Sequence, residues 1–328
     1  MLQKHKKSIM LVAFWVILAS VICSAAYPVK DIKHIMPWGA GGGTDVVMRY
    51  FMSLAEKILG VTIYTVNIPG ASSGLGVFEL MNSAPDGYTI GTLTWDSFVT
   101  VPWFGLIPGY DLARLELICT VTEHATLLAV HRDSPWQTLQ ELLQDARDRP
   151  GEIAVSNVGL GGVWHLPVLD LEKKANVKFR HVPFPGGAAE QREALIKREV
   201  EVACISYAGI LPALRAGDAR VLAVFSRDRL PELPDVPTVS EFGYDCVWGS
   251  VRVIAVPKET PEEIITKLEE VFKQVAFSDE WKEWLAKTEG AGAWTWRGRE
   301  ETKTYIQSIT TSAWRMMDEL EEAGVLKR

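Results

Sequence analysis

Short apolar runs alternate with amphipathic, helix-like stretches along the chain from residue 27 onward. The first unit is an apolar run over 31–36, a glycine-rich turn, and an amphipathic helix over 46–59 that Gly60 ends. Apolar runs of this length between turn residues are typical of buried strands, and their alternation with helices is typical of α/β folds. The pattern therefore predicts an α/β protein with mainly parallel sheets.

The same order of strand, glycine turn and helix recurs in the second half of the chain. Further strands are predicted over 61–66, 88–94, 152–156, 178–182, 200–206, 220–225 and 250–256, with a β-rich region over 115–130. Further helices are predicted over 77–83, 134–148, 163–175, 188–198 and 299–322, with another helical pattern that begins at 260–263 and continues through 282–284. These elements form two similar lobes whose glycine turns follow strand ends, where open α/β sheets bind ligands. If the two edges face each other, the turns line one cleft between the lobes.

The first glycine turn, Pro37-Trp-Gly-Ala-Gly-Gly-Gly-Thr-Asp45, has the chemistry of an anion site. Four glycines in five positions free the backbone for positive φ and for close approach to a ligand. The first turn of the helix that follows offers unpaired N–H groups and the positive end of its dipole. Such a corner binds phosphate or carboxylate.

Nucleotide-binding and hydrolytic motifs are incomplete in this chain. The first turn lacks the Gly-Lys-Ser/Thr ending of a P-loop, which supplies the phosphate-binding lysine and the magnesium-binding hydroxyl. In the turn over 159–162 the third glycine follows the second by one place, whereas a dinucleotide fingerprint needs three. There is no Gly-x-Ser-x-Gly elbow, and the histidines are scattered without metal-ligand spacing. Kinase, dehydrogenase, hydrolase and zinc-dependent functions are therefore disfavoured.

The first 26 residues have the layout of a secretory signal peptide. Three lysines precede an apolar run over 9–22, and Ser24-Ala25-Ala26 supplies small residues for cleavage before Tyr27. The mature protein is therefore expected to be periplasmic or otherwise extracytoplasmic. A retained membrane anchor is the alternative, but the run is short for a full span. Lipidation of Cys23 is disfavoured because the bulky Ile22 precedes it.

The charge of the mature chain argues about its binding partners, and its cysteines limit the number of disulfides. Removal of residues 1–26 takes away three lysines and no acid, so the net charge goes from −7 to −10. An acidic surface argues against nucleic acid, and it leaves the attraction of an anion to local backbone dipoles. Cys119 and Cys204 lie in apolar runs and are predicted to be buried strand residues. With Cys246 they make three cysteines, enough for at most one disulfide.

Four side chains near the glycine turns have both a structural and a ligand-binding interpretation. Asp45, in a first helical turn, favours the helix dipole and ties up loop N–H groups, and could otherwise bind a ligand ammonium or hydroxyl. His165 either caps its turn or contacts the ligand. Trp38 and Trp95 follow strands beside glycine turns, so each is either a core aromatic or a wall of the cleft.

An ordered series of short motifs covers nearly all of the mature chain. The motifs are Tyr27-Pro28, the turn over 37–45, Asn67-x-Pro-Gly-Ala71, Ala84-Pro-Asp-Gly-Tyr-Thr89, Thr138-Leu-x-Glu-Leu142, Pro150-Gly151, His165-Leu166, His181-Val-Pro-Phe184 with Gly186-Gly187, Leu233-Pro-Asp-Val-Pro-Thr238-x-x-Glu241 and Pro257-x-x-Thr-Pro261. In this order the series resembles the periplasmic solute receptors of tripartite tricarboxylate transporters, the Bug family. Each motif alone is weak, but the ordered series is specific.

The resemblance implies a two-domain fold of the periplasmic binding protein type II kind, a Venus flytrap with two crossovers between its domains. The domains would be 27–128 plus 251–328, and 129–250. A di- or tricarboxylate, or a related organic acid, would be held between them and delivered to the permease subunits of the membrane transporter. The receptor would be a monomer that needs no cofactor or metal and has no enzymatic activity.

In the family, backbone amides, hydroxyls and ordered water of the glycine turns hold the ligand. The predicted ligand-binding residues of the first domain are Trp38, Gly39, Ala40, Gly41, Gly42, Gly43, Thr44, Asp45, Gly70, Ala71, Ser72, Ser73, Gly74, Trp95 and Asp96. Those of the second domain are Asn157, Gly159, Gly161, Gly162, His165, Phe184, Gly186, Gly187 and Ala188.

The chain departs from the family pattern at three places. Gly162 stands where serine or threonine is usual, Pro185 replaces a lysine or another polar residue, and Ser250-Val-Arg-Val253 stands for a Ser-Trp-Arg-Gly stretch. These changes argue against transferring a specific substrate such as citrate, glutamate or aspartate. Two other functions remain open: a sensor of the same fold that signals without transport, and an enzyme acting on a carboxylate. The missing nucleophile–base pair counts against the enzyme.

Overall fold

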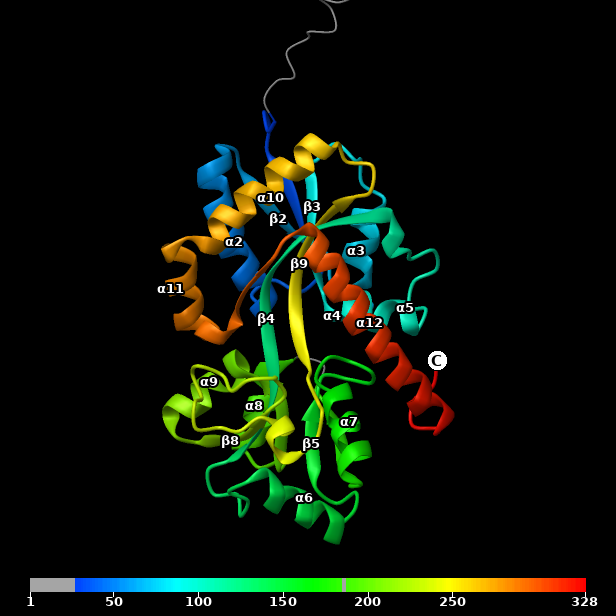
Figure 1. The fold of residues 1–328 in the computed structure, drawn as a ribbon, viewed down its shortest axis with the longest axis vertical. Coiled ribbons are helices and arrows are strands. Elements are labelled where there is room, and N and C mark those ends of the chain that lie inside the picture. Colours follow the sequence, from blue (N-terminus) through cyan, green and yellow to red (C-terminus); the bar gives the residue numbers. More distant parts are fainter. Residues whose placement is uncertain (1–26, 185–186) are drawn as a thin grey trace, which may run out of the picture.

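A computed structural model of the chain describes residues 27–184 and 187–328. The predicted signal peptide, with Cys23, and the predicted site residue Gly186 lie outside the described residues. The described chain forms two α/β lobes stacked along the long axis of the molecule, and two long strands, β4 and β9, run from one lobe to the other (Figure 1). The mixed α/β fold with two lobes agrees with the fold class predicted from the sequence.

The first lobe is formed by both ends of the described chain. Its strands are β1 (Ile32–Met36), β2 (Ile63–Asn67), β3 (Thr89–Thr94), β10 (Trp294–Arg297), β9 (Gly249–Pro257) and the first part of β4 (Leu115–His131). Its helices are α2 (Gly43–Leu59), α3 (Gly74–Met81), α4 (Trp95–Phe98), α5 (Thr100–Trp103), α10 (Glu262–Phe277), α11 (Asp279–Thr288) and α12 (Arg299–Glu322). The sheet has the order β2-β1-β3-β9-β4, and β10 pairs with β4.

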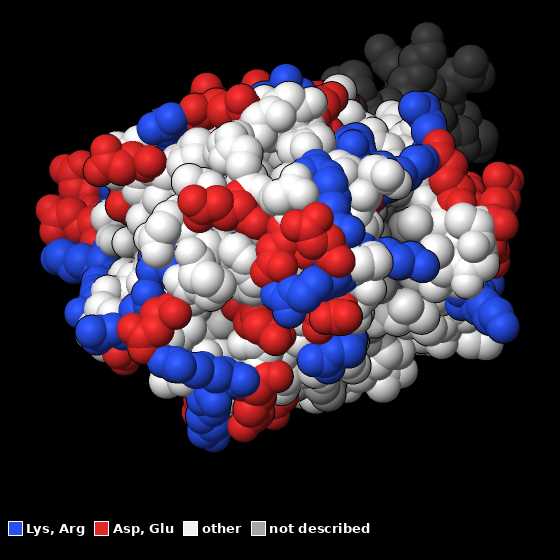
Figure 2. Space-filling model, turned by 90° about the horizontal axis from the view of Figure 1, so that it is seen from below, with Lys and Arg blue, Asp and Glu red and all other residues white. Residues whose placement is uncertain are grey.

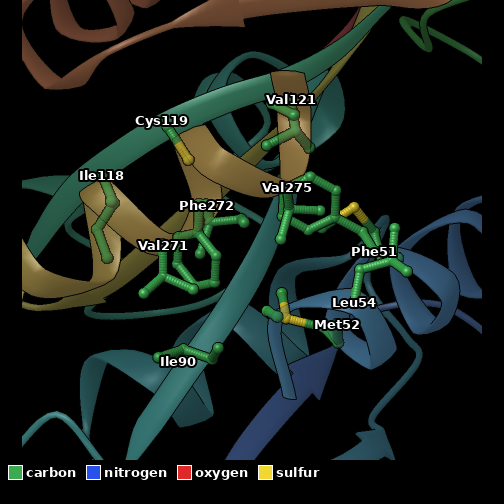
Figure 3. Close-up of a cluster of buried hydrophobic side chains, with 14 of the residues drawn as sticks. Phe51, Met52, Leu54, Ile90, Ile118, Cys119, Val121, Val271, Phe272 and Val275 are labelled. Carbon is green, nitrogen blue, oxygen red and sulfur yellow. The ribbon is translucent and has the colours of Figure 1, made fainter. Parts of the chain in front are cut away.

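The core of the first lobe is formed where α2 and α10 cover one face of this sheet (Figure 3). Phe51 and Phe272, one from each helix, are fully buried with ring centroids 5.9 Å apart. Ile118 and Val121 of β4 pack against them from the sheet. Burying one such aromatic side chain stabilises the fold by about 2–3 kcal/mol, so this cluster fixes α2 and the turn that precedes it.

The second lobe is formed by the middle of the chain. Its strands are β5 (Ala154–Asn157), β6 (Arg180–Pro183), β7 (Val202–Ser206), β8 (Ala219–Val224) and the last part of β4. Its helices are α6 (Leu139–Asp148), α7 (Leu166–Ala175), α8 (Ala188–Ile196) and α9 (Tyr207–Ala216). Strand β4 changes partners between Ala125, which pairs with β9, and Thr126, which pairs with β7. One continuous strand therefore belongs to both lobes.

Helix α12 adds a second connection between the lobes. Met316 and Met317 of this helix share one buried apolar cluster with Leu166 and Leu169 of α7. The last turns of the first-lobe helix are thus packed against the second lobe.

The prediction of mainly parallel sheets is wrong. Strand pairs β1–β2, β1–β3, β5–β6 and β5–β7 are parallel, whereas β3–β9, β4–β9, β4–β7, β4–β8 and β4–β10 are antiparallel. The reason is that each antiparallel pair contains β4 or β9. These two strands carry the chain between the lobes in opposite directions, and apolar runs alone do not show a strand's direction.

The second-lobe end of the molecule carries charges of both signs on its surface, and the cysteines of the described chain are buried. Acidic and basic side chains are interspersed on the face seen in Figure 2, which lies at the second-lobe end of the molecule. Cys119 in β4 and Cys204 in β7 are buried strand residues, as predicted, and these two and Cys246 are free thiols. No helix within residues 27–184 and 187–328 combines the length and apolar character that a membrane crossing requires.

Glu116 joins β4 to α12 through a buried carboxylate that is 1% exposed. It contacts Lys258 and lies 2.7 Å from Arg299 Nε and 2.6 Å from Lys303 Nζ. Burial alone would raise the pKa of Glu116, but hydrogen bonds from the three cations outweigh it and lower the pKa to about 2. Because the cations are partly exposed, we expect Glu116→Gln to cost about 2 kcal/mol of unfolding free energy at pH 7.

Urea unfolding of Glu116→Gln at several pH values measures this loss. A lowered pKa means that the stabilisation is present above the unfolded-state pKa and is lost as pH falls toward 2, so the difference from wild type should shrink at acidic pH. The exposed Glu259 provides the control, and Glu259→Gln should change stability by less than about 0.5 kcal/mol. Equal effects of the two substitutions would contradict the prediction.

Candidate functional site

The turns that follow β1, β2 and β3 lie together at one edge of the first-lobe sheet. The three strands are adjacent and parallel, so their carboxyl ends meet there. Asn67, at the end of β2, donates from Nδ2 to the Trp38 carbonyl oxygen at 2.8 Å, and the Ile68 N–H donates to the Met36 carbonyl at 2.8 Å. These bonds hold the first and second turns side by side.

The first turn leads into the exposed N-terminus of α2. Residues 39–43 are exposed, and Gly41 has φ of +78°, a conformation that favours glycine. The N-cap is Gly42, and within the described chain no side chain caps it. The first-turn amides of Gly43, Thr44 and Asp45 therefore depend on solvent or a ligand for their hydrogen bonds.

Asp45 is buried and its carboxylate is engaged within the protein. Arg49 Nε donates to both Asp45 oxygens at 2.9 Å, the Gly41 N–H donates at 2.9 Å, and Asn67 Nδ2 donates at 2.7 Å. Burial alone would raise the pKa of Asp45, but these hydrogen bonds lower it below its usual value. The structure thus favours the structural interpretation of this residue, which fixes the shape of the glycine turn.

The second turn is strained. Ala71, Ser72 and Ser73 have φ values of 47°, 51° and 81°, so three consecutive residues with side chains adopt the left-handed conformation. Each such residue costs about 1 kcal/mol or more, and strain of this kind concentrates at functional sites. The buried Ser73 Oγ lies 2.8 Å from Ser97 Oγ, which ties the turn to α4, the short helix after β3.

The two tryptophans of this edge occupy different environments. Trp38 is half-buried, and its indole N–H donates to Thr94 Oγ1 at 3.2 Å. Trp95 is 2% exposed and packs edge-on against Trp248, with ring centroids 6.3 Å apart. Of the two, Trp38 lies where a bound molecule could touch it, and Trp95 is a core residue.

In the second lobe, β5 and β6 bring two further turns together. The Phe184 N–H donates to the Asn157 carbonyl at 2.7 Å, and Asn157 Oδ1 accepts from the Gly159 N–H at 2.9 Å. Gly187, with φ of +88°, is the N-cap of α8, and no side chain of the described residues caps that helix either. Ala188 begins the helix, so its amide belongs to a second uncapped N-terminus.

His165 organises the turn after β5. It is 4% exposed, and its Nδ1 accepts from the Gly161 N–H at 3.0 Å. Burial, with a contribution from His181, lowers the pKa of His165 to about 3. The ring is therefore neutral with its hydrogen on Nε2, so it caps its own turn and keeps one donor.

Asp96 connects the two lobes. It lies in α4, directly after β3, and is 8% exposed; Thr100 Oγ1 lies 3.0 Å from its Oδ1 and 3.1 Å from the Gly161 carbonyl oxygen. Burial raises the pKa of Asp96 to about 6. A Cβ on Gly161 would lie 2.5 Å from the Phe104 ring, so only glycine permits this approach of the second-lobe turn to the first lobe. Gly162 lies beside the same carboxylate.

Arg252 is a charged residue of the first-lobe edge that is not among the predicted site residues. It lies on β9 in register with Thr94, the last residue of β3, and it is 7% exposed. The resemblance of Ser250-Val-Arg-Val253 to a family motif was a signal for it, but the motif alone does not show that the side chain reaches the glycine turn. No group of three or more His, Cys, Asp and Glu side chains suited to a metal occurs among residues 27–184 and 187–328.

Known proteins share this architecture. The sequence matches the family described as "Tripartite tricarboxylate transporter family receptor" over residues 47–321. A TctC solute binding protein from Polaromonas, solved without ligand, is 30% identical with a TM-score of 0.76, and the match covers 90% of this chain and 100% of that one. The periplasmic binding protein BugD is 25% identical with a TM-score of 0.77, covering 92% and 100%. A protein of R. palustris solved with adipate is 24% identical with a TM-score of 0.80, covering 91% and 98%, and shares the fold.

Proposed function

Because this chain belongs to the tripartite tricarboxylate transporter receptor family, which includes the Bug proteins, we propose that it captures a small carboxylate between its lobes and delivers it to a membrane permease. As a member of this family of periplasmic binding proteins, it is a solute-binding receptor and not an enzyme. The proposal includes export through the signal peptide 1–26, action as a monomer, and contact with permease subunits of the same transporter type.

The observation that carries the proposal is the exposed, uncapped N-terminus of α2. Its three first-turn amides come from Gly43, Thr44 and Asp45, beside the strained turn at 71–73. Neutral N–H groups of this kind hold carboxylate oxygens without a charged side chain. The Asp45 carboxylate, which would otherwise repel an anion, is paired with Arg49. Together these features favour an anion of low charge over a nucleotide.

We propose that ligand capture closes the lobes by a hinge at the point where β4 changes partners, next to Ala125. The domain division at 27–128 plus 251–328 and 129–250 belongs to this proposal, and the partner change close to residue 128 supports it. Closure would bring the α8 turn at Gly187 and Ala188 opposite the α2 corner, which is the glycine turn over 39–42 with the first helical turn of α2. Exclusion of water would then strengthen the amide–carboxylate contacts.

We propose a di- or tricarboxylate, or a related organic acid, as the ligand. The adipate in the R. palustris protein of this fold is a dicarboxylate, and two uncapped helix N-termini in the two lobes offer one donor set for each end of such a molecule. The half-buried Trp38 offers an apolar surface for the carbon chain between them.

A thermal-shift screen of the mature chain tests this function with acetate, succinate, adipate, citrate, benzoate and inorganic phosphate. A ligand present at 100 times its Kd should add about 2.7 kcal/mol to the unfolding free energy and raise the melting temperature. At least one carboxylate should give this shift. Stabilisation by phosphate and by none of the carboxylates would contradict the proposal.

A sensor of the same fold would bind the same ligand without transport. Co-purification distinguishes the two functions, because a transport receptor should bind permease subunits more tightly when the ligand is present. Binding of the ligand-loaded chain to a signalling protein, with no binding to permease, would favour the sensor.

A further inference from the structure

Arg252 lies behind the α2 corner at the edge where ligand binding is proposed. It is in register with Thr94 of β3 on one side and with Thr122 of β4 on the other. The side chain is 9% exposed, so its charge is almost removed from solvent. A buried guanidinium at a strand edge needs partners, and the identity of these partners shows what the charge acts on.

The guanidinium contacts three elements of the first lobe. Nη1 donates to Thr122 Oγ1 at 3.1 Å and also lies against His124 Nε2. Nη2 lies 3.3 Å from Glu289 Oε2, and Nε lies 3.4 Å from Thr44 Oγ1. The contact with Thr44 brings the charge to the first turn of α2.

Glycine at position 43 leaves the space between the guanidinium and the turn open. The nearest atom to the place where a Gly43 Cβ would lie is Arg252 Nη2, at 4.0 Å. The positive charge is therefore within a few ångströms of the amides at 43 and 44. Its field and the dipole of α2 have the same sign at the corner.

Glu289 is the acid that opposes this field; burial raises its pKa, and Arg252 acts against that rise by stabilising the carboxylate. His124 does not contribute a charge, because burial and the neighbouring Arg252 hold its pKa well below the ordinary value. Asp45, the other acid at the corner, is paired with Arg49. Glu289 makes a single contact with Arg252 at 3.3 Å, weaker than a two-bond pairing of carboxylate and guanidinium.

We propose that Arg252 is a specificity-determining residue of the carboxylate site and that Glu289 limits how strongly its charge attracts the ligand. This inference rests on the proposed function, since it assigns a charged residue to the same corner. It extends the binding chemistry beyond neutral amides. Removal of the Glu289 charge should strengthen carboxylate binding, whereas a purely structural ion pair would give weaker or unchanged binding when one partner is removed.

The test measures Kd by calorimetry at pH 7.5 for the carboxylate that gives the largest shift in the thermal screen. Glu289→Gln, which keeps the side-chain shape, should bind it about tenfold more tightly than wild type. In an Arg252→Met background Glu289 loses the cation that lowers its pKa and favours its charged form, so the same Glu289→Gln substitution should give no tightening. Glu116→Gln is the matched control, because Glu116 is also a buried acid paired with cations but lies at the far end of β4, and its Kd should equal that of wild type.

The outcomes separate the two proposals. Tighter binding by Glu289→Gln in the wild-type background, with no tightening in the Arg252→Met background, supports the role of Arg252. Equal tightening in both backgrounds overturns it. Unchanged or weaker binding by Glu289→Gln, with wild-type binding intact, overturns this role and leaves the proposed function standing. If the wild type binds none of the tested carboxylates, the proposed function fails and the inference fails with it.

Discussion

Gly42→Val is expected to weaken carboxylate binding at least 100-fold, a loss of about 2.7 kcal/mol of binding free energy. Gly42 is the N-cap of α2, and the side chain of an N-cap residue lies beside the amides of the first helical turn. The two methyl groups of valine would therefore cover the donors proposed to hold the ligand. Calorimetry with the carboxylate identified by the thermal screen measures the loss.

The same substitution should leave the fold intact. Gly42 has φ of −68°, which any residue adopts, and a Cβ would lie 3.2 Å from the Gly39 carbonyl oxygen, so a small shift of an exposed turn is enough. Valine is a poor N-cap, and we expect a stability cost of about 1 kcal/mol. Gly298→Val is the control at the N-cap of α12, which has the same φ, although there a Cβ would lie 2.7 Å from Glu269 Oε1 and that side chain must move. The control should lose at least as much stability and still bind normally. Wild-type affinity in Gly42→Val would remove this turn from the site.

Local sequence pattern was sufficient to predict the glycine turns and the strands before them. The run over 31–36 became β1, and the run over 152–156 became β5, because buried strands between helices need uninterrupted apolar residues. The four glycines of the first turn allow positive φ, and Gly41 adopts it. These features depend only on neighbours in the sequence.

Features that depend on partners distant in the sequence could not be predicted. Strand β4 continues from one lobe into the other without a turn, so the apolar region gave no sign of its change of partners. Helix α9 was missed because Pro212 interrupts its pattern, although Ser206 caps it by accepting from the Gly209 N–H. The positive φ values at 71–73 could not be predicted, because none of these three residues is a glycine.

The position of the charged residues in the candidate site could not be predicted from local sequence pattern either. Arg252 reaches Thr44 across 208 positions of sequence, and Thr100 reaches the Gly161 carbonyl across 61. Only the pairing of β3 with β9, and the approach of α7 to the first lobe, brings these groups together. The backbone N–H donors of the glycine turns can be predicted from the sequence, whereas the charged side chains beside them are placed by the strand topology.

Asp96→Asn is expected to remove a pH-dependent penalty of about 3 kcal/mol from the unfolding free energy. The buried carboxyl has its pKa raised from 3.8 to about 6, so between these values the folded protein holds a proton that the unfolded chain releases. The contribution of Asp96 to stability is therefore fully present below about pH 4, falls as pH rises, and is lost above about pH 6. Asparagine carries no charge, and its oxygen can still accept the hydrogen bond from Thr100.

Urea unfolding of both proteins between pH 4 and pH 7.5 measures this effect as a difference, in which the titration of other groups cancels. The variant should gain stability relative to wild type as pH rises through 5 and 6. Asp235 is exposed, so Asp235→Asn should follow wild type across the whole range. A constant difference between Asp96→Asn and wild type would mean that Asp96 ionises normally in the folded protein. This carboxyl lies beside the second-lobe turn at Gly161 and Gly162, so the group that this experiment titrates lies at a contact between the lobes.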